Sequence, residues 1–461
     1  MLNNKIKGIS SLIGSILTHL LIGNIFGFGN FIPYLISYLH YKGKEIKELD
    51  LYFIPAIGIA LHNMLPSLTG YLDIILGTRI LLLIGIILIS ISQFLIFQFT
   101  TEYYILIISY ILFGIANSLT YFQTMKNCWK YFPNKKGIIT GLILSSFGLS
   151  VFIFTSIGDY IINPNGSSTL DNGYYSEEIS NNFLIYIKFY LFSIIIIGFI
   201  SVILVFPYEN EIKIEELINN ENNDNNNIDY TILPKDSSDN SRIDNDNIEN
   251  NISNNELNIN NKEEYPSLNE CLCSKEFLIC ILTVGCTLLF GFLLSNTYRT
   301  FGKIMKIKEK YLQTLSKCYT LINTFSRIIW GIILDKFNFT IPYFILCVNQ
   351  IICSGFFYWS VFKVETYYLV CCFGVLSFAG HVTLFPNVIN KKFGIENSVT
   401  LLGICGLFSG ITCLLGPILT KSIIVSNDDY MIIYLIGSFT SLISSILTWF
   451  IKYEKVDFKK V

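Results

Sequence analysis

Apolar runs of about 20 residues, the length a helix needs to cross a bilayer, recur along the whole chain and limit its fold more than any other feature. The composition agrees, because 52% of the residues are hydrophobic and only 14% are charged, whereas about a quarter are charged in soluble domains. We therefore predict an all-α membrane protein whose twelve spanning helices cover residues 10–38, 51–69, 79–98, 103–125, 138–159, 184–206, 274–296, 312–334, 341–361, 367–388, 398–422 and 430–451.

The first run is longer than the apolar core of a signal peptide, and it has no small-residue cleavage site. We expect it to remain as the first membrane helix. The predicted location is the plasma membrane, with an organelle membrane as the alternative, so the lipid bilayer is the expected surrounding. The net charge of −2 gives no general attraction toward nucleic acid, and no such partner is predicted.

A polar segment from 208 to 269 separates the sixth run from the seventh and is rich in Asn, Asp, Glu and Ser. It holds too few apolar side chains to offset the cost of ordering, so we predict a disordered cytoplasmic linker. It is either a spacer or a partner-binding segment. The predicted domains are therefore two six-helix bundles, over residues 1–207 and 270–461.

The two predicted bundles share short sequence patterns at nearly constant offsets, which indicates an internal repeat. The pairs are Phe26-Gly-Phe28 with Phe290-Gly-Phe292, Gly70…Asp73 with Gly331…Asp335, and Asn134-Lys-Lys-Gly137 with Asn390-Lys-Lys-Phe-Gly394. Two pseudo-symmetric six-helix halves are the architecture of large secondary transporters, which place the substrate at the interface between the halves.

Basic residues suggest that both chain ends are cytoplasmic, because most of them fall on the side of the ends. The sequon Asn165-Gly-Ser167 lies on the predicted outer side, where glycosylation would test the orientation. The loops on that outer side nevertheless carry two groups of lysines, Lys42, Lys44 and Lys47 after the first run and Lys303, Lys306, Lys308 and Lys310 after the seventh.

No pattern typical of an enzyme, a metal site or a cofactor site is present in the sequence. The twelve cysteines are scattered without the spacing of a zinc site, so we expect ordinary membrane-buried thiols. The glycine-rich run Gly23–Gly29 lies within the first apolar run, where helix packing explains it better than nucleotide binding. We predict no enzymatic activity, no metal and no cofactor.

Arg327 lies well inside the eighth apolar run, where a lone guanidinium costs at least about 3 kcal/mol in lipid. On a helix it shares one face with Ser316, Thr320, Asn323 and Gly331. We expect this face to meet a cavity, a partner or a substrate. The alternatives are an intramembrane ion pair, or a side chain that extends to the membrane interface.

The loop after the eighth run, Gly331-Ile-Ile-Leu-Asp335-Lys336, resembles the inner-loop motif of the major facilitator superfamily. Its first-half copy is Gly70-Tyr-Leu-Asp73…Arg79, where the aspartate comes one residue early. Glycine allows two helices to approach closely, and the carboxylate can then interact with a helix N-terminus and a basic side chain to close an inner gate. The gating candidates are Gly70, Asp73, Arg79, Gly331, Asp335 and Lys336.

Residues 127–148 and 385–417 resemble the regions around the fifth and eleventh helices of the monocarboxylate transporters and related oxalate/formate antiporters. The shared features are an aromatic-Phe pair, a basic pair and a glycine-spaced helix. In that branch an arginine of the eighth helix is associated with binding the substrate carboxylate, and Arg327 matches its position. A guanidinium fits this role because it binds a carboxylate through two parallel hydrogen bonds.

The chain departs from the branch at several positions. It lacks the lysine often found in the first or eleventh helix, with Asn30 near the former position, and Asn323 stands where an acid tends to precede the arginine. One cationic position suits a monocarboxylate better than a dicarboxylate. The substrate-binding candidates are Arg327, Asn323, Thr320, Asn30, Asn117 and Thr120, although helix–helix hydrogen bonding explains Asn117 and Thr120 equally well.

Three intramembrane histidines, His19, His62 and His381, are candidates for proton coupling, because imidazole titrates near neutral pH. The alternative for each is a buried, hydrogen-bonded structural histidine.

The predicted function is secondary active transport of a small organic anion, such as lactate, pyruvate or formate, by alternating access with a proton. Another solute in the same fold, such as an amino acid or a drug-like compound, is one alternative. A non-transporting membrane sensor or scaffold, whose linker binds partners, is the other.

Overall fold

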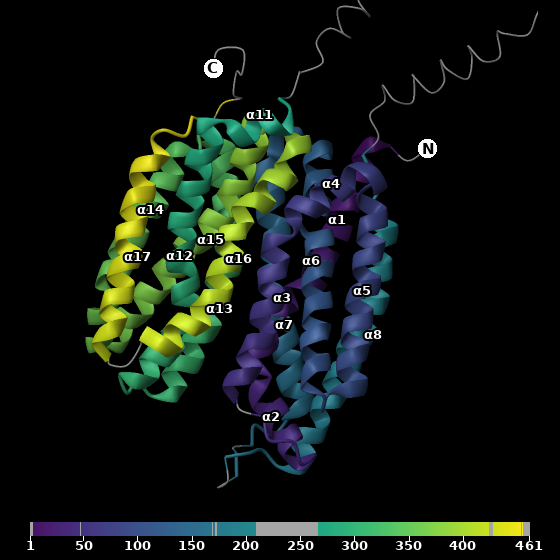
Figure 1. Ribbon diagram of the computed structural model, residues 1–461, viewed down its shortest axis with the longest axis vertical. Coiled ribbons are helices and arrows are strands. Elements are labelled where there is room, and N and C mark those ends of the chain that lie inside the picture. The colour runs from purple at the N-terminus through teal and green to yellow at the C-terminus, as the bar shows by residue number, and fades with distance from the viewer. Residues whose placement is uncertain are drawn as a thin grey trace, which may run out of the picture. The chain divides into compact units, whose positions relative to one another are not determined.

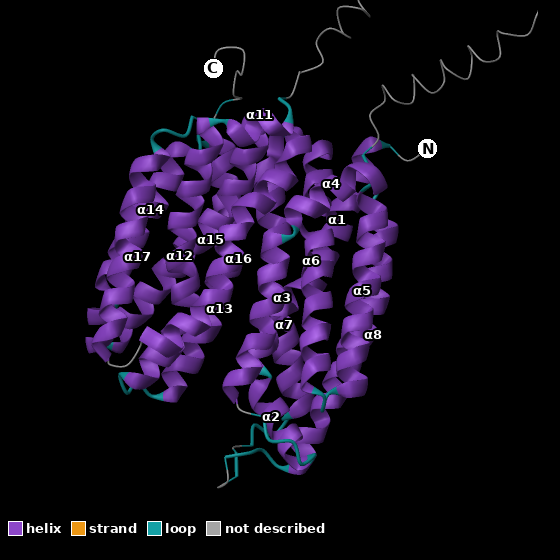
Figure 2. Cartoon of the chain, viewed as in Figure 1, coloured by secondary structure: helices purple, strands orange, loops and turns teal. Residues whose placement is uncertain are grey.

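The computed structural model describes residues 3–46, 48–167, 169–170, 173–208, 266–423, 427–452 and 454, and over these residues the chain is built from helices (Figures 1 and 2). The first half contains α1 (Asn4–Ile22), η1 (Gly23–Asn30), α2 (Ile32–Tyr41), α3 (Glu48–Met64), α4 (Pro66–Leu76), α5 (Thr78–Phe99), α6 (Tyr103–Tyr131), η2 (Pro133–Lys135), α7 (Lys136–Ile162) and α8 (Glu177–Leu204). The second half contains α11 (Leu268–Cys273), α12 (Lys275–Ile304), α13 (Glu309–Lys336), α14 (Thr340–Phe356), η3 (Tyr358–Phe362), α15 (Val364–Phe393), α16 (Ile395–Ile423) and α17 (Asn427–Thr448).

Each of the twelve predicted spans coincides with a helix or with consecutive helical segments. The first span is α1 with η1 and α2, the second is α3 with α4, and the others are α5 to α8 and α12 to α17. Within the described residues, eight helical stretches are long and apolar enough to cross a membrane, and three shorter apolar helices accompany them. The predicted all-α fold is confirmed.

Helix α13 is absent from both of those groups, although it fills the place of the eighth span. Its polar face, which includes Asn323 and Arg327, lowers its hydropathy below that of a lipid-facing helix. Its neighbours explain how this face is tolerated, because α13 packs extensively against α7 and α15 and not only against lipid.

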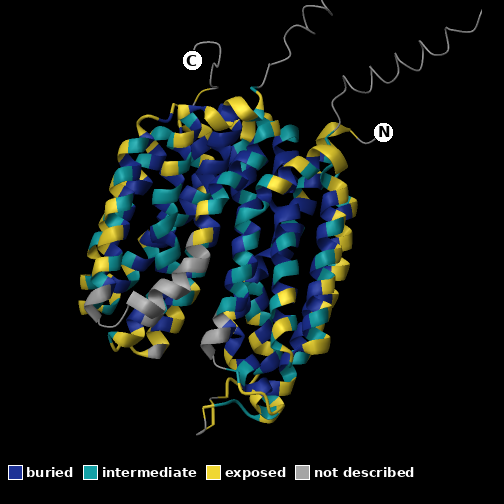
Figure 3. Cartoon of the chain, in the orientation of Figure 1, coloured by how far each residue is buried: buried dark blue, intermediate teal, exposed yellow. Residues whose placement is uncertain are grey.

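The helices before and after the Asn-rich segment pack into one compact unit. Buried residues concentrate between the helices, and exposed residues lie along the outer faces (Figure 3). Many exposed side chains are large and apolar, such as Ile74, Phe199 and Phe439, which is the surface a lipid-facing helix requires. Residues 209–265 lie outside the described residues, so the predicted disorder of the linker and the domain boundaries stay predictions.

The two halves meet through close helix contacts at glycines. A Cβ atom at Gly331 of α13 would lie 2.3 Å from the carbonyl oxygen of Gly137 of α7. On the other side of the molecule, a Cβ at Gly406 of α16 would lie 2.1 Å from the carbonyl oxygen of Asn63 of α3. Both contacts require a residue without a side chain. The pairs α7 with α13 and α3 with α16 lie side by side in Figure 1.

The first span is interrupted by the 3₁₀ segment η1, which contains the glycine-rich run. A Cβ at Gly23 would lie 2.2 Å from the carbonyl oxygen of Phe147 of α7, so this glycine serves close packing, as the sequence indicates. Pro33 lies in the first turn of α2, where proline is tolerated. A long 3₁₀ stretch inside a helix often marks a hinge.

The turn after α12 contains an unusual backbone conformation. Lys306 has a φ of +62°, and the turn closes with a hydrogen bond from the Ile307 N–H to the Gly302 carbonyl (2.9 Å). Such helix ends normally place glycine at the left-handed position. A residue with a Cβ there costs about 1 kcal/mol.

Candidate substrate site and inner gate

Arg327 projects from α13 toward α7 and is only 5% exposed. Its Nη1 donates to the carbonyl oxygen of Leu144 in α7 (2.7 Å), and its Nη2 donates to Oδ1 of Asn323 one turn earlier (3.2 Å). Its Nε has no hydrogen-bond partner. The guanidinium is therefore held at the contact between the halves with a donor left over.

Neither alternative explanation for Arg327 matches this geometry. The side chain is buried and bonded to the middle of α7, so it does not extend to a membrane interface. It also has no carboxylate within the 4.0 Å of an ion pair among the described residues. The titratable groups in its electrostatic range include His19, Tyr121 and Tyr319. A buried cation without an anionic side chain beside it is the principal feature of the site.

Four rings from four helices form an aromatic cluster near Arg327: His19 of α1, His62 of α3, Tyr121 of α6 and Phe147 of α7. Tyr121 is central, with centroid distances of 4.9 Å to His19, 4.8 Å to His62 and 5.2 Å to Phe147. All four side chains are buried. The structure therefore brings two of the three candidate histidines together.

The two histidines of this cluster keep unused ring nitrogens. His19 bonds through Nδ1 to the Ser15 carbonyl oxygen (2.9 Å), which leaves Nε2 without a partner. His62 leaves Nδ1 without a partner. Buried polar atoms are normally hydrogen-bonded, so these two nitrogens are available for a proton or a ligand.

His381 lies elsewhere, on α15 in the second half. Its ring packs edge-on against Tyr343 of α14 at 4.6 Å, and neither ring nitrogen has a partner. The structure does not bring it to His19, His62 or Arg327 in any described contact.

The remaining substrate-binding candidates separate into two groups. Thr320 and Asn323 lie half-buried on the same face of α13 as Arg327. Asn30, by contrast, is exposed and donates to Thr155 of α7 (3.2 Å), about 16 Å along the helix axis from Leu144. Thus α13 carries its candidates as a set, whereas Asn30 is remote from the arginine.

Asn117 and Thr120 of α6 face other helices of the first half. Asn117 is fully buried and donates to the carbonyl oxygen of Ile22 in α1 (3.1 Å). The methyl group of Thr120 packs against α5, since a Cβ at Gly85 would lie 2.3 Å from it. These contacts agree with the helix–helix alternative.

Asp335 sits at the N-terminus of α7. Its Oδ1 accepts from the Gly137 N–H and its Oδ2 from the Ile138 N–H, both at 2.8 Å. These N–H groups have no partner within their own helix, and the helix dipole favours an anion there. We call these two bonds the Asp335 latch, because they join the second half to the first.

Two further contacts support the latch on the same end of α7. Lys136 donates to Oδ1 of Asn390 in α15 (2.8 Å). One turn later, Thr140 and Asn387 lie within hydrogen-bond distance of each other (3.2 Å). Lys336 is exposed and has no ion pair with a described residue, so it takes no visible part.

Asp73 makes a different connection in the first half. It accepts from Thr78 (2.8 Å) and from Nζ of the buried Lys126 of α6 (3.1 Å). Lys126 also pairs with Glu396 in the first turn of α16 (2.8 Å), and Glu396 pairs with Lys130 (2.6 Å). The four charged residues Asp73, Lys126, Glu396 and Lys130, which we call the Lys126 bridge, join the halves through ion pairs.

Gly70 and Arg79 complete the first-half copy of the motif. A Cβ at Gly70 would lie 2.9 Å from the backbone nitrogen of Thr400, so α4 packs closely on α16. Arg79 instead donates to the carbonyl oxygen of Val202 in α8 (3.2 Å) and lies over the ring of Phe206. It supports the packing of the first half and does not touch Asp73 in any described contact.

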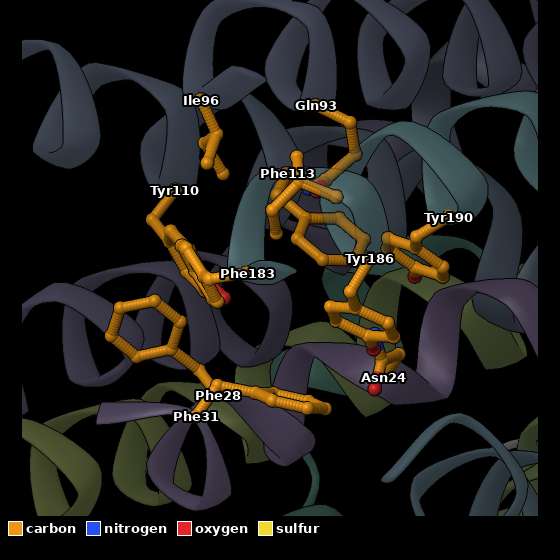
Figure 4. Close-up of a pocket in the computed structure, with 11 residues that line it drawn as sticks. Asn24, Phe28, Phe31, Gln93, Ile96, Tyr110, Phe113, Phe183, Tyr186 and Tyr190 are labelled. Carbon is orange, nitrogen blue, oxygen red and sulfur yellow. The ribbon is translucent and has the colours of Figure 1, made fainter. Parts of the chain in front are cut away.

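A small cavity of about 20 Å³ lies inside the first half and does not include Arg327 (Figure 4). It is lined mostly by aromatic rings, with Asn24 and Gln93 as its polar residues. Its volume suits about one water molecule. It is too small for an organic solute.

The candidates predicted from the sequence do not include Tyr121, Phe147, Lys126, Lys130 or Glu396. Tyr121 and Phe147 sit in aromatic-rich sequence, where nothing distinguishes them from lipid-facing rings. From the sequence, Lys126 is one of the basic residues that fall on the side of the chain ends. Lys126 follows directly after the fourth apolar run, 103–125, one turn before Lys130, so the sequence alone gives no reason to expect it to be buried.

The fold and the site define a multi-pass helical membrane protein whose two halves meet around a buried arginine. The sequence model of the major facilitator superfamily matches residues 12–417. The chain belongs to this superfamily, a family of transporters and not of enzymes, and is an integral membrane protein.

Solved structures of the same fold cover nearly the whole chain. The proton:xylose symporter XylE, bound to 6-bromo-6-deoxy-D-glucose, has a TM-score of 0.65 at 12% identity over 97% of this chain and 96% of its own. FucP in the outward conformation has a TM-score of 0.63 at 11% identity, over 98% and 100%. At this identity the likeness establishes the fold alone.

Two curated relatives align with part of the chain. The "Uncharacterized MFS-type transporter YhjX" of Escherichia coli is 25% identical over 157 residues, which are 34% of this chain and 38% of that protein. The "Probable transporter MCH1" of Wickerhamomyces anomalus is 30% identical over 142 residues, 30% of this chain and 28% of that protein. The monocarboxylate branch therefore stays a prediction.

Proposed function

We propose that the protein is a secondary active transporter that carries a small organic monoanion, such as lactate, pyruvate or formate, together with a proton. The observation that carries this proposal is the buried Arg327 without a carboxylate beside it among the described residues. An unpaired buried charge is costly. An anionic substrate supplies the missing partner.

The geometry of the guanidinium favours one carboxylate. Arginine has five N–H donors, and the bonds to Leu144 and Asn323 use two of them. A carboxylate takes two parallel N–H bonds, which the unused donors, Nε included, can provide. The neighbours of Arg327 named above, His19, Tyr121 and Tyr319, include no lysine or second arginine, which suits a monoanion better than a dianion.

The aromatic cluster favours a small solute with a short apolar part. The centres of its other three rings lie 4.8 to 5.2 Å from that of Tyr121, and His19 and Tyr121 lie in electrostatic range of Arg327. Apolar walls with a few placed polar groups are typical of small-molecule sites. His19 and His62 are the proposed proton carriers, because each has a ring nitrogen without a hydrogen-bond partner. His19 lies in electrostatic range of both Arg327 and His62. Protonation there would help to balance the substrate's negative charge.

The Asp335 latch and the Lys126 bridge support transport by alternating access. Both join the halves at the same end of α7 and α16, where they would have to break for this end to open. Rigid halves that rock about a central site are the usual means of alternating access.

Uptake of radiolabelled pyruvate into proteoliposomes with an inward proton gradient tests the proposal. We expect saturable, acid-stimulated uptake, at least tenfold lower in Arg327→Ala and partly retained in Arg327→Lys, which keeps the charge but loses the fork. Glu177→Gln, which removes an exposed charge from α8, should resemble wild type. Equal uptake by Arg327→Ala would remove the arginine from the site.

A panel with a neutral sugar and an amino acid addresses the other solutes. Transport of either in place of pyruvate would overturn the anion assignment. Deletion of residues 209–265 addresses the scaffold alternative, because a transporter should keep uptake without that segment.

A further inference from the structure

The α12–α13 hairpin concentrates positive charge on the side opposite the two inner-gate contacts. Between Arg299 and Lys317 the sequence has one arginine and five lysines against a single acid, Glu309. If the chain ends are cytoplasmic, these residues face outward, where short loops normally carry few lysines. The hairpin therefore keeps its charge against the usual trend.

The corresponding loop of the first half neutralises its lysines locally. Lys44 pairs with Glu102 at 3.1 Å, and Lys42 lies 5.4 Å from the centre of the Tyr38 ring, as in a cation–π contact. These two lysines stabilise their own surroundings, so they need no further role.

Three lysines of the hairpin have no such ion pair or cation–π contact with the part of the chain that the structure describes. Lys306, Lys308 and Lys310 are exposed, and none has an ion pair with a described residue. Lys306 also occupies the left-handed position that glycine normally takes at a helix end. A charged residue kept at a strained position suggests that the charge itself has a use.

The hairpin leads directly to the proposed site along α13. Ser316, Thr320 and Asn323 are half-buried on one face of this helix. Arg327, one turn after Asn323 on the same face, is buried. The distance from Lys310 to Arg327 along the axis is about 26 Å. Lys317, one residue past Ser316, lies in electrostatic range of Asp159 at the far end of α7. This end of the polar face of α13 therefore lies near α7, and we call it the mouth of the path.

We propose that Lys306, Lys308 and Lys310 form an anion-collecting site at the mouth of the path, from which a carboxylate passes along the polar face of α13 to Arg327. The identity of the carboxylate rests on the proposed function, whereas the positive potential of the mouth does not. Clefts lined by one sign of charge raise the local concentration of an oppositely charged solute and its association rate.

The first experiment measures pyruvate uptake by the triple variant Lys306→Glu/Lys308→Glu/Lys310→Glu. We expect KM to rise at least fivefold in low-salt buffer with Vmax within twofold of wild type, and the difference to shrink at high salt. The matched control reverses three lysines near the chain ends, Lys5, Lys7 and Lys452, and should leave KM unchanged. An equal KM for the two triple variants would refute the collecting site.

The second experiment does not require transport. Ser316→Cys places a thiol inside the mouth, and its rate of modification is compared for an anionic and a cationic methanethiosulfonate of similar size. The labelling rate of the parent protein, which lacks this cysteine, is subtracted from each rate as background. We expect the anionic reagent to be favoured, and the triple lysine variant to reverse the preference by at least tenfold. A preference that the triple variant does not change would refute the proposal even if pyruvate is transported.

Lys306→Gly separates charge from folding, because glycine relieves the strained backbone while it removes the charge. We expect a thermal stability equal to or above wild type, together with a smaller preference for the anionic reagent. If pyruvate is not transported but the thiol preference follows the lysines, the proposed function fails while the collecting site stands.

Discussion

Asn in place of Asp335 should open the inner end of the protein. The carboxylate accepts two N–H bonds of 2.8 Å from α7, and bonds to a charged group contribute about 1.5–3 kcal/mol each when buried. Since Asp335 is exposed, we discount each bond to about 1 kcal/mol. Asparagine keeps one acceptor oxygen but turns its NH₂ group toward the other N–H, so one hydrogen bond and the negative charge are both lost. The closed state then loses about 1.4 kcal/mol of stabilisation, which shifts the equilibrium between the closed and open states about tenfold toward the open state.

Labelling of a cysteine at Thr140 measures this shift. Thr140 is fully buried at the contact with α15, so a maleimide reaches it only when the inner end opens. We expect Asp335→Asn to raise the labelling rate of Thr140→Cys about tenfold. Glu177→Gln removes an exposed charge from α8 and should have no effect. A labelling rate within twofold of the parent would refute the role of the latch.

Three further predictions test separate parts of the site. His62→Gln, which fills a similar volume but does not titrate, should abolish acid stimulation of uptake while uptake at neutral pH persists; retained stimulation would remove His62 from proton coupling. Reversal of either Asp159 or Lys317 should slow transport by at least threefold, and the double reversal should recover it, as a double-mutant cycle of uptake rates would reveal. Lys126→Met leaves Asp73 buried without its cation and should destabilise the protein by about 3 kcal/mol, measured by thermal unfolding in detergent.

The helices could be predicted because the bilayer imposes a length on every span. That constraint acts on each segment separately, so the composition of a short window of the sequence is enough to detect it. The Asp335 motif was also accessible, since its parts lie within six residues of one another. The donors to this carboxylate are the N–H groups at the start of α7. The chemistry of a carboxylate predicts a helix N-terminus as its partner, but the sequence does not say which one.

The aromatic cluster could not be predicted, because its four rings come from four helices. Periodicity indicates which residues share a face of a helix, but not which neighbour that face meets. Thr120 illustrates the limit. It follows the polar pattern of α6 as well as any residue, yet its methyl group packs against Gly85, whereas the adjacent Tyr121 faces the histidines.

Burial also gives different surroundings to two residues of the same type. Lys126 and Lys130 are one turn apart on α6, and the sequence gives no reason to separate them. The structure leaves the side chain of Lys130 27% exposed and that of Lys126 3% exposed, next to Asp73. Both lysines pair with Glu396 of the second half, but only Lys126 is also buried against Asp73.

The two inner-gate contacts differ because of one residue of spacing. Gly70 and Gly331 both lie at contacts between the halves, but Asp73 follows its glycine by three positions and Asp335 by four. One residue turns a helix by about 100°. Asp335 consequently meets the N-terminus of α7 directly, whereas Asp73 points toward α6, where Lys126 carries the connection to Glu396. The early aspartate of the first half is therefore not a degraded copy of the motif, because the buried lysine restores the connection that the spacing removed.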